Sequence, residues 1–247
     1  MATKPSIPKG TRDFSSLEIA KRNYLKNILQ ITFEEYGFSP IETPSFEKLE
    51  TLTGVYGDEG DRLVFKILNS GEKIKKADFN AYNNGENYKF IKSISEKALR
   101  YDLTVPFARY VVQHQNEITF PFRRYQIQPV WRADRPQRGR FQEFIQCDAD
   151  IVGNRSLWQE VEVLHLYDRI FNKLRIKDVN LRINHRNILV AIISLFENES
   201  RVHDFTVTLD KLNKIGKKEV FKELIGKNFN TNLLDILEKI FDFQENF

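Results

Sequence analysis

The chain has 247 residues, enough for one large domain or one domain with a small companion, and its 41% hydrophobic and 29% charged residues exclude a disordered chain. A net charge of +4 is compatible with a polyanionic partner without requiring one, and a single cysteine excludes an intrachain disulfide and fits a reducing compartment. No apolar run approaches the ~20 residues that span a bilayer and the N-terminus lacks the apolar core of a signal peptide, so the sequence predicts a cytoplasmic protein without membrane contact.

The N-terminal part of the chain is predicted to form a long helix followed by an extended segment. Ser15 and Glu18 have the spacing of a capping box and Gly37 is a natural stop, so we expect a helix from about residue 16 to 36. Its apolar stripe is expected to consist of Leu17, Tyr24, Ile28 and Ile31. Two prolines then exclude a helix in residues 38–44, which we expect to be extended and to lie at an edge or interface.

Short elements are expected between this segment and residue 115. Residues 62–68 resemble a strand that ends at an Asn-Ser-Gly turn, and residues 98–102 resemble a second strand. Between them, residues 73–87 are rich in lysine and asparagine without a periodic pattern, which predicts a surface excursion. Residues 104–115 predict a helix with Pro106 in its first turn, where proline is tolerated.

Residues 125–151 predict two strands joined by an arginine-rich loop. In the second strand the even-numbered residues form a polar face, because alternate side chains of a strand point to opposite sides. These residues are Arg140, Gln142, Phe144, Gln146, Asp148 and Asp150. Burying unpaired carboxylates is costly, so this face is better suited to hold a small molecule with phosphate and ammonium groups than to fill a core.

The rest of the chain is predicted to form a long helix, a strand and then helices alone. Ser156 and Gln159 have the spacing of a second capping box, at the start of a helix that runs to Leu174. Residues 179–183 alternate like a strand. Four helices are expected after that, at residues 188–196, 202–212, 218–225 and 232–241. This change from mixed helices and strands to helices alone predicts a domain boundary after residue 186.

The residues of the hairpin loop each have a functional and a plain interpretation. Arg132, next to Trp131 at the end of a strand, has a guanidinium that could grip phosphate in a forked geometry. Together with Asp134 and Arg140 it could equally be part of a solvated hairpin tip, since surface charges are common. Phe144 could stack a purine base or be a simple core phenylalanine.

The polar residues outside the loop are open to the same two interpretations. Gln146 and Asp150 lie about 13 Å apart on one face of a strand, where they could bind a substrate or be exposed polar residues of a half-covered sheet. Asp102 and Thr104 lie at a strand-to-helix junction, where Thr104 could simply cap the helix. Cys147 falls on the apolar face and is expected to pack rather than to react.

The sequence argues against two common kinds of ligand site. The four histidines share no ligand spacing, so we predict no metal bound by the protein itself. There is no Walker loop and no GxGxxG segment, so a nucleotide would have to bind at a site of another type.

Several motifs, in the right order between about residues 6 and 186, closely resemble the histidyl-tRNA synthetase family. They are Pro8–Phe14, Phe38–Glu47, Leu99–Thr104, Val130–Pro136, Gly139–Phe141 and Gln146–Ile151. The resemblance implies an α+β fold of the class II synthetase type, with an antiparallel sheet flanked by helices. Residues 1–186 would be the first part of the catalytic domain, and residues 187–247 the start of a helical insertion domain.

The resemblance also implies an activity and an ATP site. The family activates histidine with ATP, supplied as its Mg²⁺ complex, and transfers it to tRNA(His). Arg132 would be the catalytic residue and would bind the α-phosphate of ATP and the carboxylate of histidine. Asp134 and Arg140 would hold ATP further along, and Phe144 would stack on adenine.

A histidine site and a homodimer follow from the same resemblance. Histidine would be bound by Asp102, Leu103, Thr104, Arg132, Gln146 and Asp150. Within this set Asp102, Thr104 and Gln146 would bind the ammonium group, and Asp150 would accept a hydrogen bond from the imidazole side. Pro44 would lie at a dimer interface.

A complete synthetase of this family continues well past residue 247, so we expect an N-terminal fragment with little or no activity alone. Two alternatives remain open. A regulatory paralogue acting on an ATP phosphoribosyltransferase would share the fold, although it could relax the substrate residues. A non-enzymatic RNA-binding module is suggested by the basic hairpin, but it would leave Asp102 and Asp150 without a role.

Overall fold

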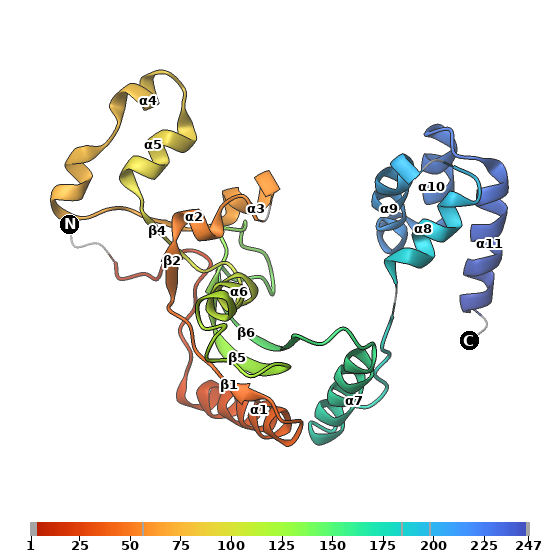
Figure 1. The fold of residues 1–247 in the computed structure, drawn as a ribbon, viewed down its shortest axis with the longest axis horizontal. Helices are drawn as coiled ribbons and strands as arrows, with labels where there is room; N and C mark the ends of the chain where they lie inside the picture. The colour runs from red at the N-terminus through yellow and green to blue at the C-terminus, as the bar shows by residue number, and fades with distance from the viewer. Residues whose placement is uncertain (1–3, 56, 184, 198, 246–247) are drawn as a thin grey trace. The chain divides into compact units, whose positions relative to one another are not determined.

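The computed structural model describes residues 4–55, 57–183, 185–197 and 199–245. The chain divides into two compact units, Met1–Val179 and Asn180–Phe247, and the division falls a few residues before the boundary expected after residue 186 (Figure 1). The first unit contains both sheets, and the second is helical.

The first long helix, α1 (Ser16–Glu35), starts as its sequence predicts. Ser15 accepts a hydrogen bond from the backbone of Glu18, whose side chain returns to the backbone of Ser15, so the capping box is confirmed. The predicted apolar stripe is wrong, because α1 contacts the sheet through Phe33 and Leu29 near its C-terminal end. Of the predicted stripe, Leu17, Tyr24 and Ile31 are exposed.

The predicted hairpin is confirmed and forms the centre of the first unit. Strands β5 (Phe122–Trp131) and β6 (Glu143–Val152) pair antiparallel over their whole length, from Phe122 opposite Val152 to Trp131 opposite Glu143. The extended segment predicted at residues 38–44 contributes β1 (Ser39–Pro40), which pairs parallel with β5. The sheet order is therefore β1-β5-β6.

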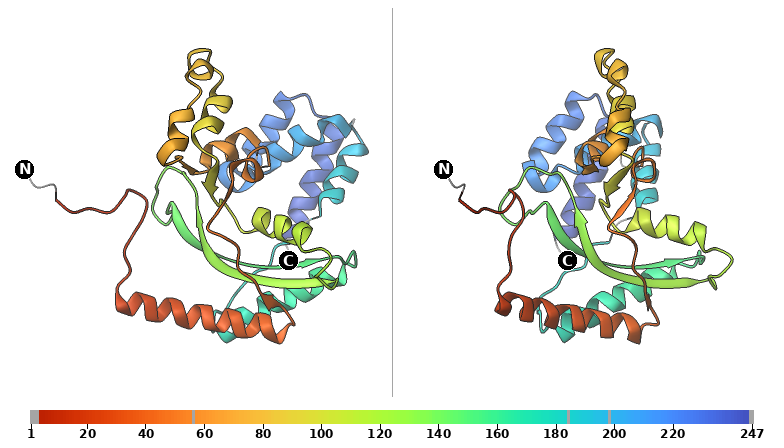
Figure 2. Two further views of the ribbon diagram at one scale, coloured as in Figure 1. Left: turned by 60° about the vertical axis from the view of Figure 1, so that its left-hand side comes forward. Right: turned by 90° about the vertical axis from the view of Figure 1, so that its left-hand side faces the viewer.

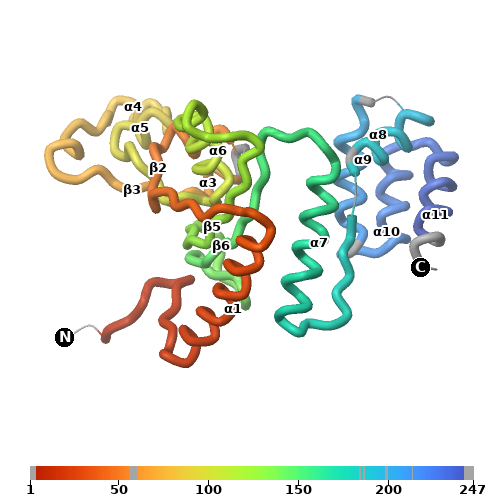
Figure 3. The backbone as a smooth tube through the Cα atoms, turned by 60° about the horizontal axis from the view of Figure 1, so that its bottom comes forward, coloured from red at the N-terminus to blue at the C-terminus, as the bar shows by residue number. Residues whose placement is uncertain are grey.

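The odd-numbered face of this hairpin is covered by α1 and by α7 (Trp158–Lys173). Figures 2 and 3 show both helices on one side of the two long strands. The buried residues of this core are Phe33, Phe38, Tyr125, Leu166 and Ile170. Helix α6 (Thr104–Gln113), which is confirmed with Pro106 in its first turn, lies on the other side of the hairpin (Figure 2).

A second small sheet has the order β2-β4-β3, with strands Phe46–Lys48, Lys97–Leu99 and Lys66–Ile67. Helices α2 (Leu49–Leu52) and α3 (Gly57–Leu63) adjoin it in the chain. The strand expected at residues 62–68 is wrong at its start, where residues 62 and 63 end α3, and it is confirmed only for Lys66 and Ile67. A short apolar run does not distinguish helix from strand by its periodicity, which accounts for the error.

The lysine-rich excursion contains short helices that its sequence pattern did not predict. It contains a 3₁₀ helix (Gly71–Lys76) and α4 (Phe79–Asn83), and is followed by α5 (Asn87–Ile94). Asp78 caps α4 by accepting a hydrogen bond from the backbone N–H of Ala81 at 2.9 Å. The ring centroids of Tyr82 and Phe90 lie 5.1 Å apart, so a small aromatic contact holds α4 against α5.

Two further predictions after the hairpin are wrong. The capping box at Ser156 is not formed, because the N-cap of α7 is one residue later than predicted. This N-cap is Leu157, which makes no side-chain hydrogen bond to the helix. Ser156 instead accepts a hydrogen bond from Trp158 N–H at 3.3 Å. Residues 179–183 form no strand, because no neighbouring strand pairs with them within the described residues.

The second unit, considered by itself, consists of helices as predicted. They are α8 (Arg186–Ser194), a 3₁₀ turn (Glu199–Arg201), α9 (Val202–Leu209), α10 (Leu212–Gly226) and α11 (Thr231–Glu245). Gly216 interrupts α10 with a φ of 79°, so the part after it starts close to the predicted residue 218. The buried core includes Ile193, Phe205, Val220, Leu224, Leu233 and Leu237. None of the described helices combines the length and the hydropathy needed to cross a membrane.

Candidate active site

The even-numbered face of the hairpin is polar, and it is the face turned away from α1 and α7. Residues directly opposite each other on antiparallel strands point to the same side of the sheet, so the register determines which side chains meet. The cross-strand pairs on this face are Phe122 with Val152, Arg124 with Asp150, Gln126 with Asp148, Gln128 with Gln146, and Val130 with Phe144. The predicted alternation is therefore confirmed from Phe144 to Asp150, whereas Arg140 and Gln142 lie before the strand begins.

Arg132 is held at one end of this face by aromatic rings and a backbone carbonyl. Its Nε donates a hydrogen bond to the carbonyl oxygen of Tyr101 at 3.2 Å. The carbon of its guanidinium lies 4.4 Å from the ring centroid of Tyr101 and 5.2 Å from that of Phe144. Contact with two rings restricts the guanidinium, which is half-buried. Phe144 thus packs against a charged group of the polar face rather than within the apolar core.

Three carboxylates surround the other end of the face. Burial is the largest cause that raises the pKa of Asp148; Arg124 opposes this effect, Asp150 and Asp102 add to it, and Arg132 weakly opposes it. The charged groups of the face therefore lie toward its ends, with Arg132 at one end and Arg124 among carboxylates at the other.

Arg124 lies among these carboxylates and is fully buried. Its Nη2 is 2.6 Å from Oδ2 of Asp150, an ion pair whose angles are not those of a hydrogen bond. Its guanidinium carbon lies 4.2 Å from the ring centroid of Phe107 in α6. Burial lowers the pKa of Arg124, and the charges of Asp150, Asp148 and Asp102 counter that effect. Alternation placed Asp148 on the polar face without a role, and it gave no sign of Arg124, which only the pairing of the two strands in register reveals.

Several polar atoms at this end have no hydrogen-bond partner in the described structure although they are buried. They are Oε1 of Gln146, Oδ2 of Asp150, and Nε and Nη2 of Arg124. A buried polar atom without a partner costs about 1–3 kcal/mol, so native proteins rarely keep several together unless a ligand or water completes them. The side chain of Asp150 is 38% exposed, which leaves this carboxylate accessible from one side.

The junction between β4 and α6 carries Asp102, Leu103 and Thr104. Oδ1 of Asp102 accepts a hydrogen bond from Val105 N–H at 3.2 Å. Asp102 and not Thr104 therefore pairs with a free backbone N–H in the first turn of α6. The capping interpretation of Thr104 is therefore wrong, and this side chain is exposed. The side chain of Leu103 is fully buried, so this residue can offer a ligand only its backbone.

The loop between the strands is fastened at its base, while its arginine tip is exposed. The N–H of Gln142 donates to the carbonyl of Gly10 at 2.7 Å, and the N–H of Ala133 donates to that of Leu63 at 2.8 Å. Gly10 has a φ of 85°, and a Cβ there would lie 2.7 Å from Cγ of Gln142, so the close approach requires glycine. Asp134 and Arg140 form no ion pair within the described residues, which leaves the solvated-tip interpretation open for both.

The middle of the polar face is closed by the segment that includes Pro44. Gln126 donates from Nε2 to Oγ1 of Thr43 at 2.8 Å, and Oε1 of Gln128 accepts from the N–H of Thr43 at 3.1 Å. The carbonyl of Pro44 accepts a hydrogen bond from Arg100 at 3.1 Å, while its ring is exposed. The face is therefore covered in its middle on the β5 side, whereas Gln146, Asp148 and Asp150 on β6 remain partly exposed.

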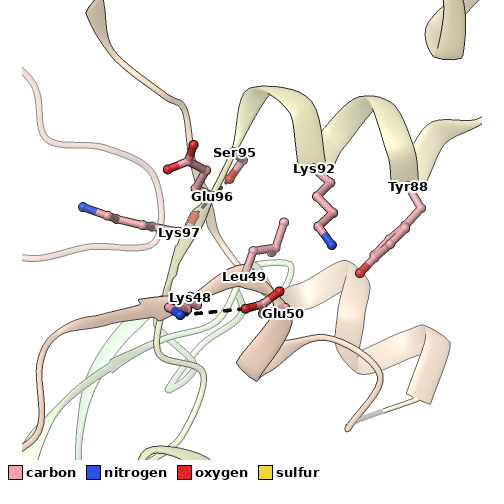
Figure 4. Close-up of a pocket in the computed structure, with 8 residues that line it drawn as sticks. All are labelled: Lys48, Leu49, Glu50, Tyr88, Lys92, Ser95, Glu96 and Lys97. Atoms are coloured by element: carbon pink, nitrogen blue, oxygen red, sulfur yellow. Dashed lines mark hydrogen bonds and ion pairs between the residues drawn. The ribbon is translucent and has the colours of Figure 1, made fainter. Parts of the chain in front are cut away.

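Two hollows in the first unit lie away from the carboxylates of this face. Figure 4 shows one of about 470 Å³, where Lys92 and Tyr88 of α5 point toward Glu50 of α2. The other, of about 600 Å³, lies between α1 and the hairpin, and Phe144 is among the residues that line it. Neither contains the carboxylates described above. Within the described residues, no group of three or more His, Cys, Asp and Glu side chains could hold a metal ion.

Cys147 lies on the odd-numbered face, as predicted, but it is exposed along the second hollow rather than packed in the core. Although part of the residue is exposed, neighbouring atoms exclude water from around its sulfur. This desolvation is the main cause that raises the pKa of Cys147 to about 12, and the charge of Asp148 adds to it. The thiolate is the reactive form, so a raised pKa leaves the thiol protonated and inert at neutral pH.

We therefore expect iodoacetamide to alkylate Cys147 at pH 8 on the order of 10²–10³ times more slowly than an ordinary cysteine. Mass spectrometry of timed samples would measure the rate, and the same chain unfolded in urea is the matched control. Alkylation of the folded protein within threefold of the unfolded rate would contradict this expectation.

Comparison with known proteins identifies the family. A family model described as Histidyl-tRNA synthetase matches residues 80–246. The histidine–tRNA ligases of Christiangramia forsetii and Flavobacterium johnsoniae are 62% and 54% identical, over 100% of this chain and 54% and 56% of their own lengths. The crystal structure of histidyl-tRNA synthetase from a Nostoc species aligns with a TM-score of 0.76 at 31% identity, covering 98% of this chain and 49% of that one.

These similarities agree with the predicted α+β fold of the class II synthetase type, and the chain spans about half the length of the curated relatives it matches. The matched region includes the whole hairpin, with Arg132 at one end of its polar face and the three carboxylates at the other. The chain belongs to the histidyl-tRNA synthetase family.

Proposed function

We propose that the protein activates histidine with ATP and transfers it to tRNA(His). The observation that carries this proposal is that one polar face of the hairpin has the guanidinium of Arg132 fixed at one end and the Asp150 carboxylate paired with Arg124 at the other. A guanidinium suited to phosphate and carboxylate thus shares one face with carboxylates suited to ammonium and imidazole. Relatives at 50–62% identity that are named histidine–tRNA ligase support the same reaction.

The chemistry needs positioning and charge neutralisation more than a dedicated base. A carboxylate oxygen of histidine attacks the α-phosphate of ATP, the bond to the β-phosphate oxygen breaks, and pyrophosphate leaves. Arg132 would donate hydrogen bonds to the α-phosphate and to the attacking carboxylate. A hydroxyl of tRNA then attacks the histidyl carbonyl and AMP leaves.

ATP would enter as its Mg²⁺ complex, since phosphate oxygens and water together supply most ligands of that ion. Phe144 would stack on adenine beside the guanidinium of Arg132, and Asp134 and Arg140 would hold the nucleotide from the loop. The exposure of Arg140 and the absence of an ion pair for it within the described residues are compatible with that role.

Histidine would be bound between the two ends of the face. Asp102 and Gln146, with the exposed hydroxyl of Thr104, would receive the ammonium group. Asp150 would accept a hydrogen bond from the imidazole, and Leu103 would contribute its backbone. The buried Oε1 of Gln146, which lacks a hydrogen-bond partner in the described structure, and the exposed part of the Asp150 side chain support this assignment.

The proposal extends to location and assembly. We assign the protein to the cytoplasm, with residues 187–247 as part of a helical insertion domain and Pro44 at the interface of a homodimer. The exposed ring of Pro44, next to a carbonyl fixed by Arg100, gives that interface a rigid element.

ATP–pyrophosphate exchange on the intact protein tests the proposal. We expect exchange that depends on histidine and is not supported by the other amino acids, followed by charging of tRNA(His). A regulatory paralogue would bind histidine without exchange. An RNA-binding module would bind RNA in a salt-dependent manner without any affinity for ATP. Either of these results would refute the proposal.

A further inference from the structure

Arg124 differs from the other buried arginine of the first unit in what it contacts. Arg100 donates to the backbone carbonyls of Thr43, Pro44 and Pro129, so it ties segments of the chain together. Arg124 instead contacts side chains: it is paired with Asp150 and donates to Oε1 of Gln126 at 3.4 Å. Arg124 is fully buried and, within the part of the chain that the structure describes, donates to no backbone carbonyl, so it orders side chains rather than the backbone.

The register explains why Asp150 is the side chain that Arg124 orders. The two residues are directly opposite on β5 and β6, and such pairs are the closest across a sheet. The ring of Phe107 lies over the guanidinium at 4.2 Å, so Arg124 has little freedom to turn away. One carboxylate oxygen of Asp150 is thus held in place, while the exposed part of that side chain remains open.

The positive charge of Arg124 also offsets the repulsion between neighbouring carboxylates. Asp148 and Asp150 are two residues apart on the same face of one strand, and Asp102 acts on Asp148 as well. Without a nearby cation these carboxylates would repel each other, and Asp150 would turn away from its neighbour. Arg124 is the buried cation paired with Asp150, so it keeps that side chain in its orientation.

We propose that Arg124 is a positioning residue that fixes the carboxylate of Asp150 toward the imidazole of histidine and thereby determines selectivity for that ring. This inference rests on the proposed function. It predicts that loss of Arg124 weakens recognition of the ring N–H and leaves ATP recognition, at the Arg132 end of the face, nearly unchanged.

The test is histidine-dependent ATP–pyrophosphate exchange on the intact protein with Arg124→Met and Arg124→Lys. A second amino acid, 3-(2-thienyl)alanine, carries a ring of similar size without an N–H donor. For Arg124→Met we expect the KM for histidine to rise about tenfold to a hundredfold, the range of one hydrogen bond to a charged group. The preference for histidine over thienylalanine in kcat/KM should fall by a similar factor, with the KM for ATP within about threefold.

Controls separate positioning from general damage. Arg123→Met removes the neighbouring arginine on the opposite face, where it is paired with Glu162, and should change neither preference nor KM. Arg124→Lys restores a cation and should recover part of the selectivity. In an Asp150→Asn background, Arg124→Met should add little further loss, because the two residues act as one unit.

The outcomes are distinguishable from failure of the proposed function. If the unaltered protein does not exchange with histidine, the proposed function itself fails. If it does, an unchanged preference in Arg124→Met, or equal rises in the KM for histidine and for ATP, overturns the inference. Should Arg124→Met not fold, Arg124→Lys decides: a larger rise in KM for histidine than for ATP supports positioning, and an equal change refutes it.

Discussion

Replacing Arg132 by alanine is expected to lower the rate of histidyl-adenylate formation about 10²–10³-fold, the usual loss when one preorganised donor to a developing charge is removed. The guanidinium is fixed by the carbonyl of Tyr101 and by two aromatic rings, so it needs little rearrangement as charge develops on the α-phosphate. Single-turnover formation of the adenylate in the intact protein would measure the effect. The loss should appear in the rate constant more than in the KM.

Two matched variants make this prediction specific. Arg132→Lys keeps the positive charge but loses the fork and the ring contacts, so it should recover only part of the rate. Arg138→Ala removes an exposed arginine of the same loop and should leave the rate within about threefold, since exposed charges far from the reacting atoms contribute little. Because Arg132 is half-buried, its replacement should barely change the melting temperature. A rate for Arg132→Ala within threefold of the unaltered protein would contradict the role assigned to this residue.

The elements that the sequence predicted best are those whose pattern is local. The hairpin follows from alternation over ten residues in each strand, and the start of α1 follows from a capping box that spans four positions. The errors arise where distant partners decide. Residues 179–183 alternate like a strand, yet no neighbouring strand pairs with them within the described chain, and a strand without a partner is not stable.

The candidate site shows the same limit. Alternation alone placed Phe144, Gln146 and Asp150 on one face, because that property belongs to a single strand. It could not identify Arg124, whose importance comes from lying opposite Asp150 on another strand, nor the contact of Arg132 with the ring of Tyr101, far away in the sequence. Cross-strand register and aromatic packing are tertiary properties that no window of sequence contains.

Arg100→Met is expected to be the most destabilising single substitution considered, at about 3–5 kcal/mol in the free energy of unfolding of the first unit. Arg100 is fully buried, with Nε 2.8 Å from the carbonyl of Pro129 and Nη1 2.6 Å from that of Thr43. Nη1 also lies 3.1 Å from Oε1 of Gln128. Methionine fills similar volume but leaves these acceptors buried without donors, and an acceptor so deprived loses more than the hydrogen bond contributed.

Burial lowers the pKa of Arg100, and Glu42 and Glu47 counter this effect, so the residue remains a cation that joins β4, β5 and the segment before β2. Urea unfolding followed by tryptophan fluorescence would measure the loss, because Trp131 lies 5.7 Å from the guanidinium. Arg109→Met is the matched control: its partly exposed ion pair with Glu47 should contribute only about 1 kcal/mol. A loss for Arg100→Met no larger than that of Arg109→Met would mean that the three segments are held by apolar packing alone, and that Thr43 closes the middle of the polar face without this arginine.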